Sequence, residues 1–196
     1  MRGFLFLGLI CAWAGMAGCG NPAKPPTDQK PGSAAPAIPE EIASAGRTAL
    51  GNEAEVLAYG DLALIGRQQV LVINRLIQPA SEQGPAIVFT RLAVLENDDG
   101  KWKEVLLCDE HLKNSSGFLG GTPNAAITAW RLQFEKNPKQ GLLLFFIPYQ
   151  QGAGVRTQTI EVRWNPEVKR YQAMDATYAN FIGEAPAIEE IHRPLK

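Results

Sequence analysis

The sequence predicts an all-β domain, a mostly antiparallel sandwich or partly open barrel, with a short N-terminal helix; a propeller-like half-sheet with a flanking helix is the alternative. Two patterns support this fold class. Apolar and polar side chains alternate over residues 130–135 and 160–164, which is typical of strands with one buried and one solvated face. Residues 70–73 and 142–147 are continuous apolar runs, which fit central strands covered on both faces.

Further strands are expected at residues 86–96, 102–108 and 170–173. Turn sequences separate the apolar runs: Asn97-Asp98-Asp99-Gly100, the glycines within residues 152–154, and Asn165-Pro166-Glu167-Val168. Because short turns join successive strands, consecutive antiparallel hairpins are the simplest topology.

Residues 40–50 carry the pattern of the short helix. Their apolar side chains recur at helical spacing and share one face: Ile42, Ala45, Ala49 and Leu50. Pro39 suits the first turn of a helix, and Gly51-Asn52 suits its end. We expect a single domain over residues 40–183, with a final helical turn at residues 175–181 and a loose tail over residues 184–196.

The N-terminal residues 1–18 have the features of a secretory signal peptide. Arg2 provides a positive charge, and the apolar segment 4–14 is too short to span a bilayer. The motif Met16-Ala17-Gly18-Cys19 resembles the lipobox of bacterial lipoproteins. That resemblance implies cleavage before Cys19 and a lipid on its thiol, which would anchor the protein in the cell envelope. A soluble secreted protein is the alternative.

Residues 19–39 are expected to form a disordered tether behind the lipidated cysteine. The segment 20–39 holds six of the fourteen prolines and little that could be buried in a core. In Gram-negative lipoproteins Asp after the acylated cysteine favours the inner membrane. Gly20 occupies that position here, so the resemblance implies the periplasmic face of the outer membrane.

Charge and cysteine content exclude several classes of protein. The net charge is −1, and −2 after removal of Arg2 with residues 1–18, so the basic excess of a nucleic-acid-binding protein is missing. Without the signal peptide, Cys19 and Cys108 are the remaining cysteines, and lipidation of Cys19 leaves no partner for a disulfide within the chain.

Residues 59–72 resemble a degenerate repeat of the FG-GAP or VCBS type. In that family an Asp-x-Asp-x-Asp-Gly loop precedes a buried strand and binds calcium. Asp61 is the surviving carboxylate here, whereas calcium needs six to eight oxygen ligands. We therefore expect no metal and no cofactor, and a turn that is retained for its shape.

Cys108-Asp109-Glu110-His111 is the densest group of reactive side chains. Neighbouring residues at a strand end point in alternating directions, so we expect a buried thiol followed by a polar loop and predict no catalytic residue. Two functional hypotheses remain. The first is a non-catalytic, lipid-anchored β-domain that binds an envelope protein or polysaccharide through the loops 109–128 and 150–156. The second is an envelope hydrolase that uses His111 with Asp109 or Glu110.

Overall fold

The computed structural model describes residues 37–78, 86–119, 127–149, 159–175 and 180–182. The contacts of the chain divide it into two units, Met1–Pro36 and Ala37–Lys196. The fold described below is that of the second unit. The expected signal peptide, lipidated Cys19, most of the tether and the C-terminal tail lie outside the described residues.

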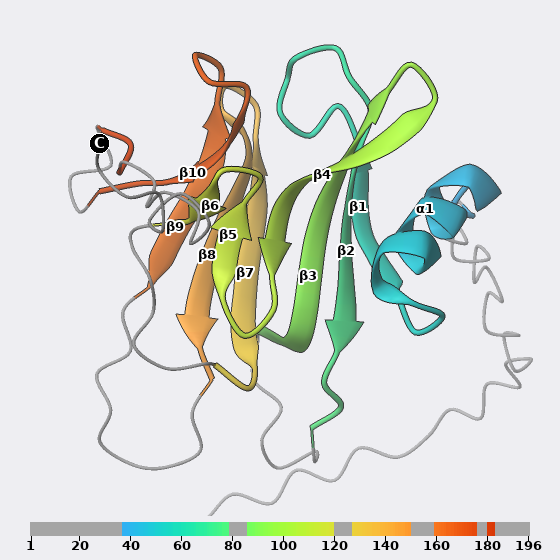
Figure 1. The fold of residues 1–196 in the computed structure, drawn as a ribbon, viewed down its shortest axis with the longest axis horizontal. Helices are drawn as coiled ribbons and strands as arrows, with labels where there is room; N and C mark the ends of the chain where they lie inside the picture. Colours follow the sequence, from blue (N-terminus) through green and yellow to red (C-terminus); the bar gives the residue numbers. More distant parts are fainter. Residues whose placement is uncertain (1–36, 79–85, 120–126, 150–158, 176–179, 183–196) are drawn as a thin grey trace, which may run out of the picture. The chain divides into compact units, whose positions relative to one another are not determined.

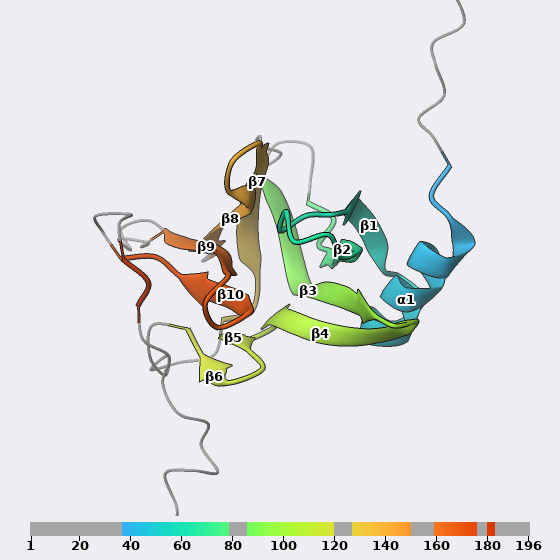
Figure 2. The ribbon, with the colours of Figure 1, turned by 90° about the horizontal axis from the view of Figure 1, so that it is seen from above.

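Among these residues, one antiparallel sheet of ten strands curls into a half-barrel, with a single helix beside it (Figures 1 and 2). The all-β prediction, in its partly open barrel form with a short N-terminal helix, is confirmed. The elements are α1 (Glu40–Leu50), β1 (Glu55–Gly60), β2 (Gln69–Arg75), β3 (Ile87–Asp98), β4 (Lys101–Cys108), β5 (Leu112–Asn114), β6 (Gly117–Phe118), β7 (Trp130–Asn137), β8 (Gly141–Pro148), β9 (Ile160–Asn165) and β10 (Arg170–Ala173).

Strand β3 is the branch point of the sheet. One of its edges pairs with β2, and β1 lies beyond β2. Its other edge pairs first with β7 and then with β4. The β2–β3 register skips Thr90, because Asn74 pairs with Arg91 and Arg75 pairs with Phe89. Such a bulge bends a strand and increases its twist, so two arms, β4–β5–β6 and β7–β8–β9–β10, leave β3 in different directions and curl around one core.

The two faces of β2 explain its continuous apolar run. Leu71 and Ile73 are fully buried in the core inside the half-barrel, whereas Val70 and Val72 are fully buried on the other face, under α1. The helix packs closely there, since a Cβ on Gly46 would lie 2.9 Å from Cγ1 of Val72. Both faces of this strand are covered, as the sequence predicts.

Strand β8 was predicted to be covered on both faces, and the structure covers one of them fully. Three of its side chains are fully buried in the main core: Leu142, Leu144 and Phe146. On the opposite face Leu143 is buried, but Phe145 and Ile147 are half-buried. No helix among the described residues covers that side of the strand.

The turn chemistry is confirmed where the structure describes it. Asp99 and Gly100 have φ angles of 52° and 83° and form the two-residue connection of the β3–β4 hairpin. The expected helical turn at residues 175–181 is wrong at its described ends. Met174 and Phe181 form an antiparallel bridge, and the Asp175 N–H donates to the Asn180 carbonyl oxygen. The turn at residues 152–154 lies outside the described residues.

Candidate binding groove

The reactive side chains that follow β4 are each held by separate contacts. Cys108 is fully buried, and burial raises the pKa of its thiol well above the ordinary value. The Asp109 carboxylate accepts hydrogen bonds from the backbone N–H of His111 at 2.9 Å and from Nζ of Lys113 at 3.1 Å. The His111 ring packs edge-on against Phe118, and its buried Nδ1 has no partner among the described residues. Asp109 therefore orders the loop backbone and does not orient the imidazole.

Asp61 closes the loop that follows β1. Its two carboxylate oxygens accept the backbone N–H groups of Ile65 and Gly66, at 2.8 and 2.9 Å. Both oxygens thus satisfy backbone donors, which fits a turn retained for its shape. Within this fixed loop Leu64 adopts a left-handed φ of 58° and remains 50% exposed. The described residues contain no cluster of three or more His, Cys, Asp or Glu side chains that could hold a metal.

This loop, residues 61–68, lies among three hairpin turns. The Leu62 carbonyl oxygen accepts the Leu142 N–H at the β7–β8 turn, and the Gln68 carbonyl oxygen accepts the Asn97 N–H beside the β3–β4 turn. The β9–β10 turn reaches the same place, since Pro166 lines the same hollows as the loop. We call this region the loop end; its loop 61–68 lies at the top of Figure 1.

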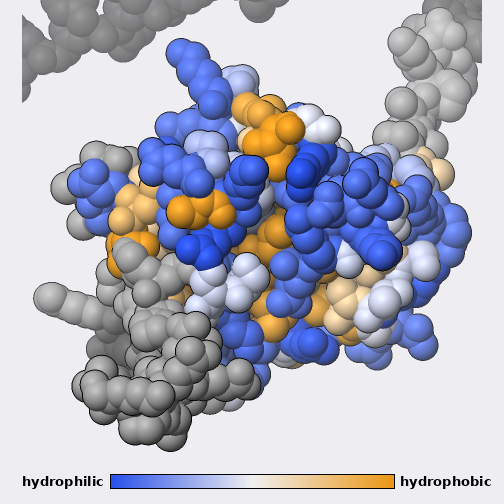
Figure 3. All heavy atoms as spheres, turned by 45° about the horizontal axis from the view of Figure 1, so that its top comes forward, coloured by the Kyte–Doolittle hydropathy of each residue, from blue (hydrophilic) through white to orange (hydrophobic). Residues whose placement is uncertain are grey.

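Two adjoining hollows of about 450 and 270 Å³ open at the loop end. They share three lining residues, Ile65, Trp164 and Pro166, and we call the two together the loop-end groove. Five of its lining side chains are basic: Arg67, Lys103, Lys139, Arg163 and Lys169. Figure 3 turns this end of the molecule toward the reader and shows hydrophobic areas separated by hydrophilic side chains.

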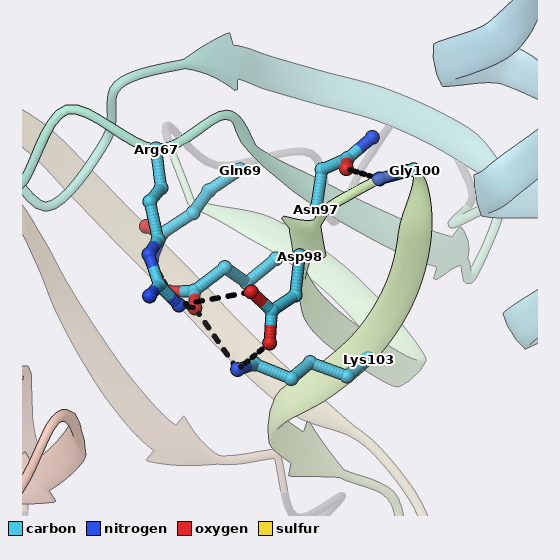
Figure 4. A network of polar contacts seen from close by, with 7 residues as sticks. Arg67, Gln69, Asn97, Asp98, Gly100 and Lys103 are labelled. Atoms are coloured by element: carbon cyan, nitrogen blue, oxygen red, sulfur yellow. Dashed lines mark hydrogen bonds and ion pairs between the residues drawn. The ribbon is translucent and has the colours of Figure 1, made fainter.

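One acidic side chain, the buried Glu96 of β3, lines the second hollow. Figure 4 shows the polar contacts that surround Arg67, Asp98 and Lys103 beside it. Glu96 accepts hydrogen bonds from Nη1 of Arg67 at 2.8 Å and Nε2 of Gln69 at 2.9 Å, and Nζ of Lys103 lies 3.3 Å away. Burial raises the pKa of this carboxyl, but the hydrogen bonds from the three side chains outweigh it, and the pKa is lowered overall. Glu96 is therefore ionised and acts as an internal counter-ion.

The basic side chains of the groove differ in how far they are neutralised. Arg67 and Lys103 also contact the carboxylate of Asp98, at 3.5 and 3.0 Å. In contrast, Lys139 and Lys169 are exposed and form no ion pair with any described residue. The fifth cation, Arg163, lies over the ring of Phe181, 5.1 Å from its centroid.

Beneath the groove, buried polar groups connect strands that are distant in the sequence. The Tyr171 hydroxyl of β10 donates to Oε1 of Gln69 of β2 at 3.0 Å, and Gln69 in turn donates to Glu96. Tyr171 and Gln69 are fully buried, and burial raises the pKa of the phenol above its ordinary value. Trp164 packs edge-on against Tyr171 at 5.4 Å, and its buried indole N–H has no partner among the described residues.

From the sequence we expected binding through the loops 109–128 and 150–156, whereas the groove is lined by other connections. Of these two surfaces, residues 120–126 and 150–158 lie outside the described part of the chain. Trp130 and Trp164 are buried, on the apolar faces of the two strands that alternation predicts. The signal that was missed is that Arg67, Lys139 and Lys169 each lie between two strands, in connections that an antiparallel sheet can bring to one end.

Comparisons with protein families, with curated proteins and with solved structures give no match for this chain. Within the described residues, no helix has the length and apolar character needed to cross a membrane.

Proposed function

We propose that this protein is a lipid-anchored component of the bacterial cell envelope whose β-domain binds an envelope protein or polysaccharide and is not an enzyme. The observation that carries the proposal is the loop-end groove, a basic hollow lined by the loop 61–68, by the β7–β8 and β9–β10 turns and by the strands beside them. Binding residues concentrate on loops that a rigid scaffold positions. The anchor rests on the resemblance of Met16-Ala17-Gly18-Cys19 to a lipobox, and Gly20 favours the outer membrane.

The contacts after β4 support binding over hydrolysis. A nucleophile needs access to substrate and a base within hydrogen-bond reach. Cys108 is fully buried, and the carboxylate of Asp109 is bonded to a backbone N–H and to Lys113. These contacts support a structural role for residues 108–113. We therefore propose that binding takes place in the loop-end groove instead.

The anchor is tested by the mass of the N-terminal peptide from the membrane fraction, measured beside a Cys19→Ala variant. We expect a peptide that begins at Cys19 and carries acyl mass, and we expect the variant to leave the membrane fraction. An unmodified terminus in a soluble protein would contradict the lipid anchor.

The binding role is tested by photo-crosslinking in cells. A photoreactive residue replaces Leu64, which is 50% exposed in the groove, and in a control replaces Ile77, which is 89% exposed beyond β2. We expect one reproducible adduct, with protein or glycan, from position 64 and not from position 77. The same scattered neighbours from both positions would refute a dedicated binding surface at the loop end.

A further inference from the structure

We infer that the ligand of the loop-end groove is an acidic polysaccharide, a chain of sugar units that carries repeated carboxylate, sulfate or phosphate groups. This inference rests on the proposed function and specifies the class of partner. Three properties of the groove support it: its charge, its hollowed shape with an apolar shared lining, and a strained residue at its rim.

The groove is basic, although the chain as a whole carries a small negative charge. The whole sequence has a net charge of −1, yet the two hollows are lined by five basic side chains and the single carboxylate of Glu96. Arg67 and Lys103 are held in place by Glu96 and Asp98, so their positions are fixed before any ligand binds. Lys139 and Lys169 lie in different hollows, one in each, and have no ion pair among the described residues. Cations in both hollows fit a ligand whose anionic groups repeat along its length.

The lining that the two hollows share favours one class of polyanion. Ile65, Trp164 and Pro166 line both hollows, so this shared lining is apolar. A peptide lying against it would bring main-chain N–H and C=O groups that need partners; Ile65 and Pro166 offer none, and the indole N–H of Trp164 is buried. A lipid surface is flat, whereas this site is hollowed. Sugar rings present apolar C–H faces to such a lining and direct hydroxyl and acidic groups toward the basic walls.

One local feature marks the groove as more than a gap between loops. Leu64 is held at a left-handed φ of 58° while remaining half exposed at the rim. Strained residues that the surrounding structure fixes in place gather at functional sites.

The test measures binding of polygalacturonate to the full chain carrying Cys19→Ala, so that no lipid contributes. Fully methyl-esterified polygalacturonate has the same backbone without the charges and serves as the matched ligand control. Calorimetry and tryptophan emission measure the affinity. We expect binding to polygalacturonate, and at least about tenfold weaker binding to the methyl ester.

Variants locate the site. Lys139→Gln combined with Lys169→Gln removes two exposed cations, and we expect about tenfold weaker binding to polygalacturonate with unchanged thermal unfolding. Lys101→Gln is the control, because Lys101 lines a separate hollow of about 660 Å³ between α1 and the β3–β4 hairpin. Its affinity should equal that of the parent chain.

Equal binding of the charged and esterified polymers, or equal effects of the control and double variants, overturns the inference. Tighter binding to polyglutamate or to phosphatidylglycerol vesicles than to polygalacturonate also overturns it, in favour of an acidic peptide or a lipid surface. If no polysaccharide binds but crosslinking at position 64 captures one envelope protein, the ligand class fails while the proposed binding function stands.

Discussion

Replacing Gly141 with Ala tests how the β7–β8 turn supports the loop end. Gly141 has a left-handed φ of 77°, and a Cβ there would lie 2.5 Å from the Leu62 carbonyl oxygen and 3.0 Å from Cα of Ala63. These atoms belong to the backbone of a loop that Asp61 fixes in place, so they cannot move aside as a flexible side chain would. The Leu142 N–H, which donates to the same Leu62 oxygen at 2.7 Å, would be displaced as well.

The expected loss has two parts. Left-handed strain costs an alanine about 1 kcal/mol, and overpacking adds about 1–3 kcal/mol. Gly141→Ala should therefore lower the free energy of unfolding by about 2–4 kcal/mol. The matched control is Gly100→Ala, where φ is 83° but no atom lies within 4 Å of the new Cβ. That variant should lose only the strain, about 1 kcal/mol.

Urea unfolding of the two variants, followed by circular dichroism, separates strain from contact. Both variants are compared with one parent protein, so at equal slope with denaturant the difference between their midpoints reports the clash at position 141 together with the displaced Leu142 hydrogen bond. Equal destabilisation of Gly141→Ala and Gly100→Ala would refute the argument that Gly141 is needed for the close approach of two backbones.

Three further predictions concern the buried polar groups and the thiol. Because the pKa of Glu96 is lowered from 4.5 in the folded protein, the ionised carboxylate stabilises the fold fully above pH 4.5, and this stabilisation is lost as the pH falls through the lowered pKa. Glu96→Gln should therefore lower the free energy of unfolding by about 1–3 kcal/mol at pH 7 and make stability less dependent on pH in the acid range. An unchanged dependence on acid pH would contradict this. Tyr171→Phe leaves Oε1 of Gln69 without its donor and should cost about 1–2 kcal/mol in urea unfolding, whereas equal stability would show that water replaces the hydroxyl. Cys108, fully buried, should react with a thiol reagent only as fast as the domain opens, and rapid labelling of the native protein would place the thiol at the surface.

Local patterns predicted most of the elements. Helical spacing and flanking Pro39 and Gly51 located the helix at residues 40–50, where the structure has it. Alternation located the strands at 130–135 and 160–164, because successive side chains of a strand point to opposite faces, one buried and one solvated. Short elements with little periodicity were missed: β1 was never delimited, and β5 and β6 lie inside what the sequence showed only as a long connection.

The candidate groove was not predictable in the same way, because its contacts join residues that are distant along the chain. Glu96 meets Arg67 across 29 positions, and Tyr171 meets Gln69 across 102. The continuous run 142–147 likewise suggested two covered faces, whereas the structure covers one face fully and leaves Phe145 and Ile147 half-buried. How much of a strand is covered depends on which elements pack on it, and sequence periodicity does not carry that information.

The all-β class, the position of the helix and the chemistry of the turns could be predicted from the sequence. These properties arise from backbone preferences and from side-chain periodicity over a few residues. The fork of the sheet at β3 and its curl, which bring the loop 61–68 and three hairpin turns together, became visible in the three-dimensional structure. Convergence of this kind depends on strand pairing between residues that are distant along the chain, and the five basic side chains share a groove for that reason.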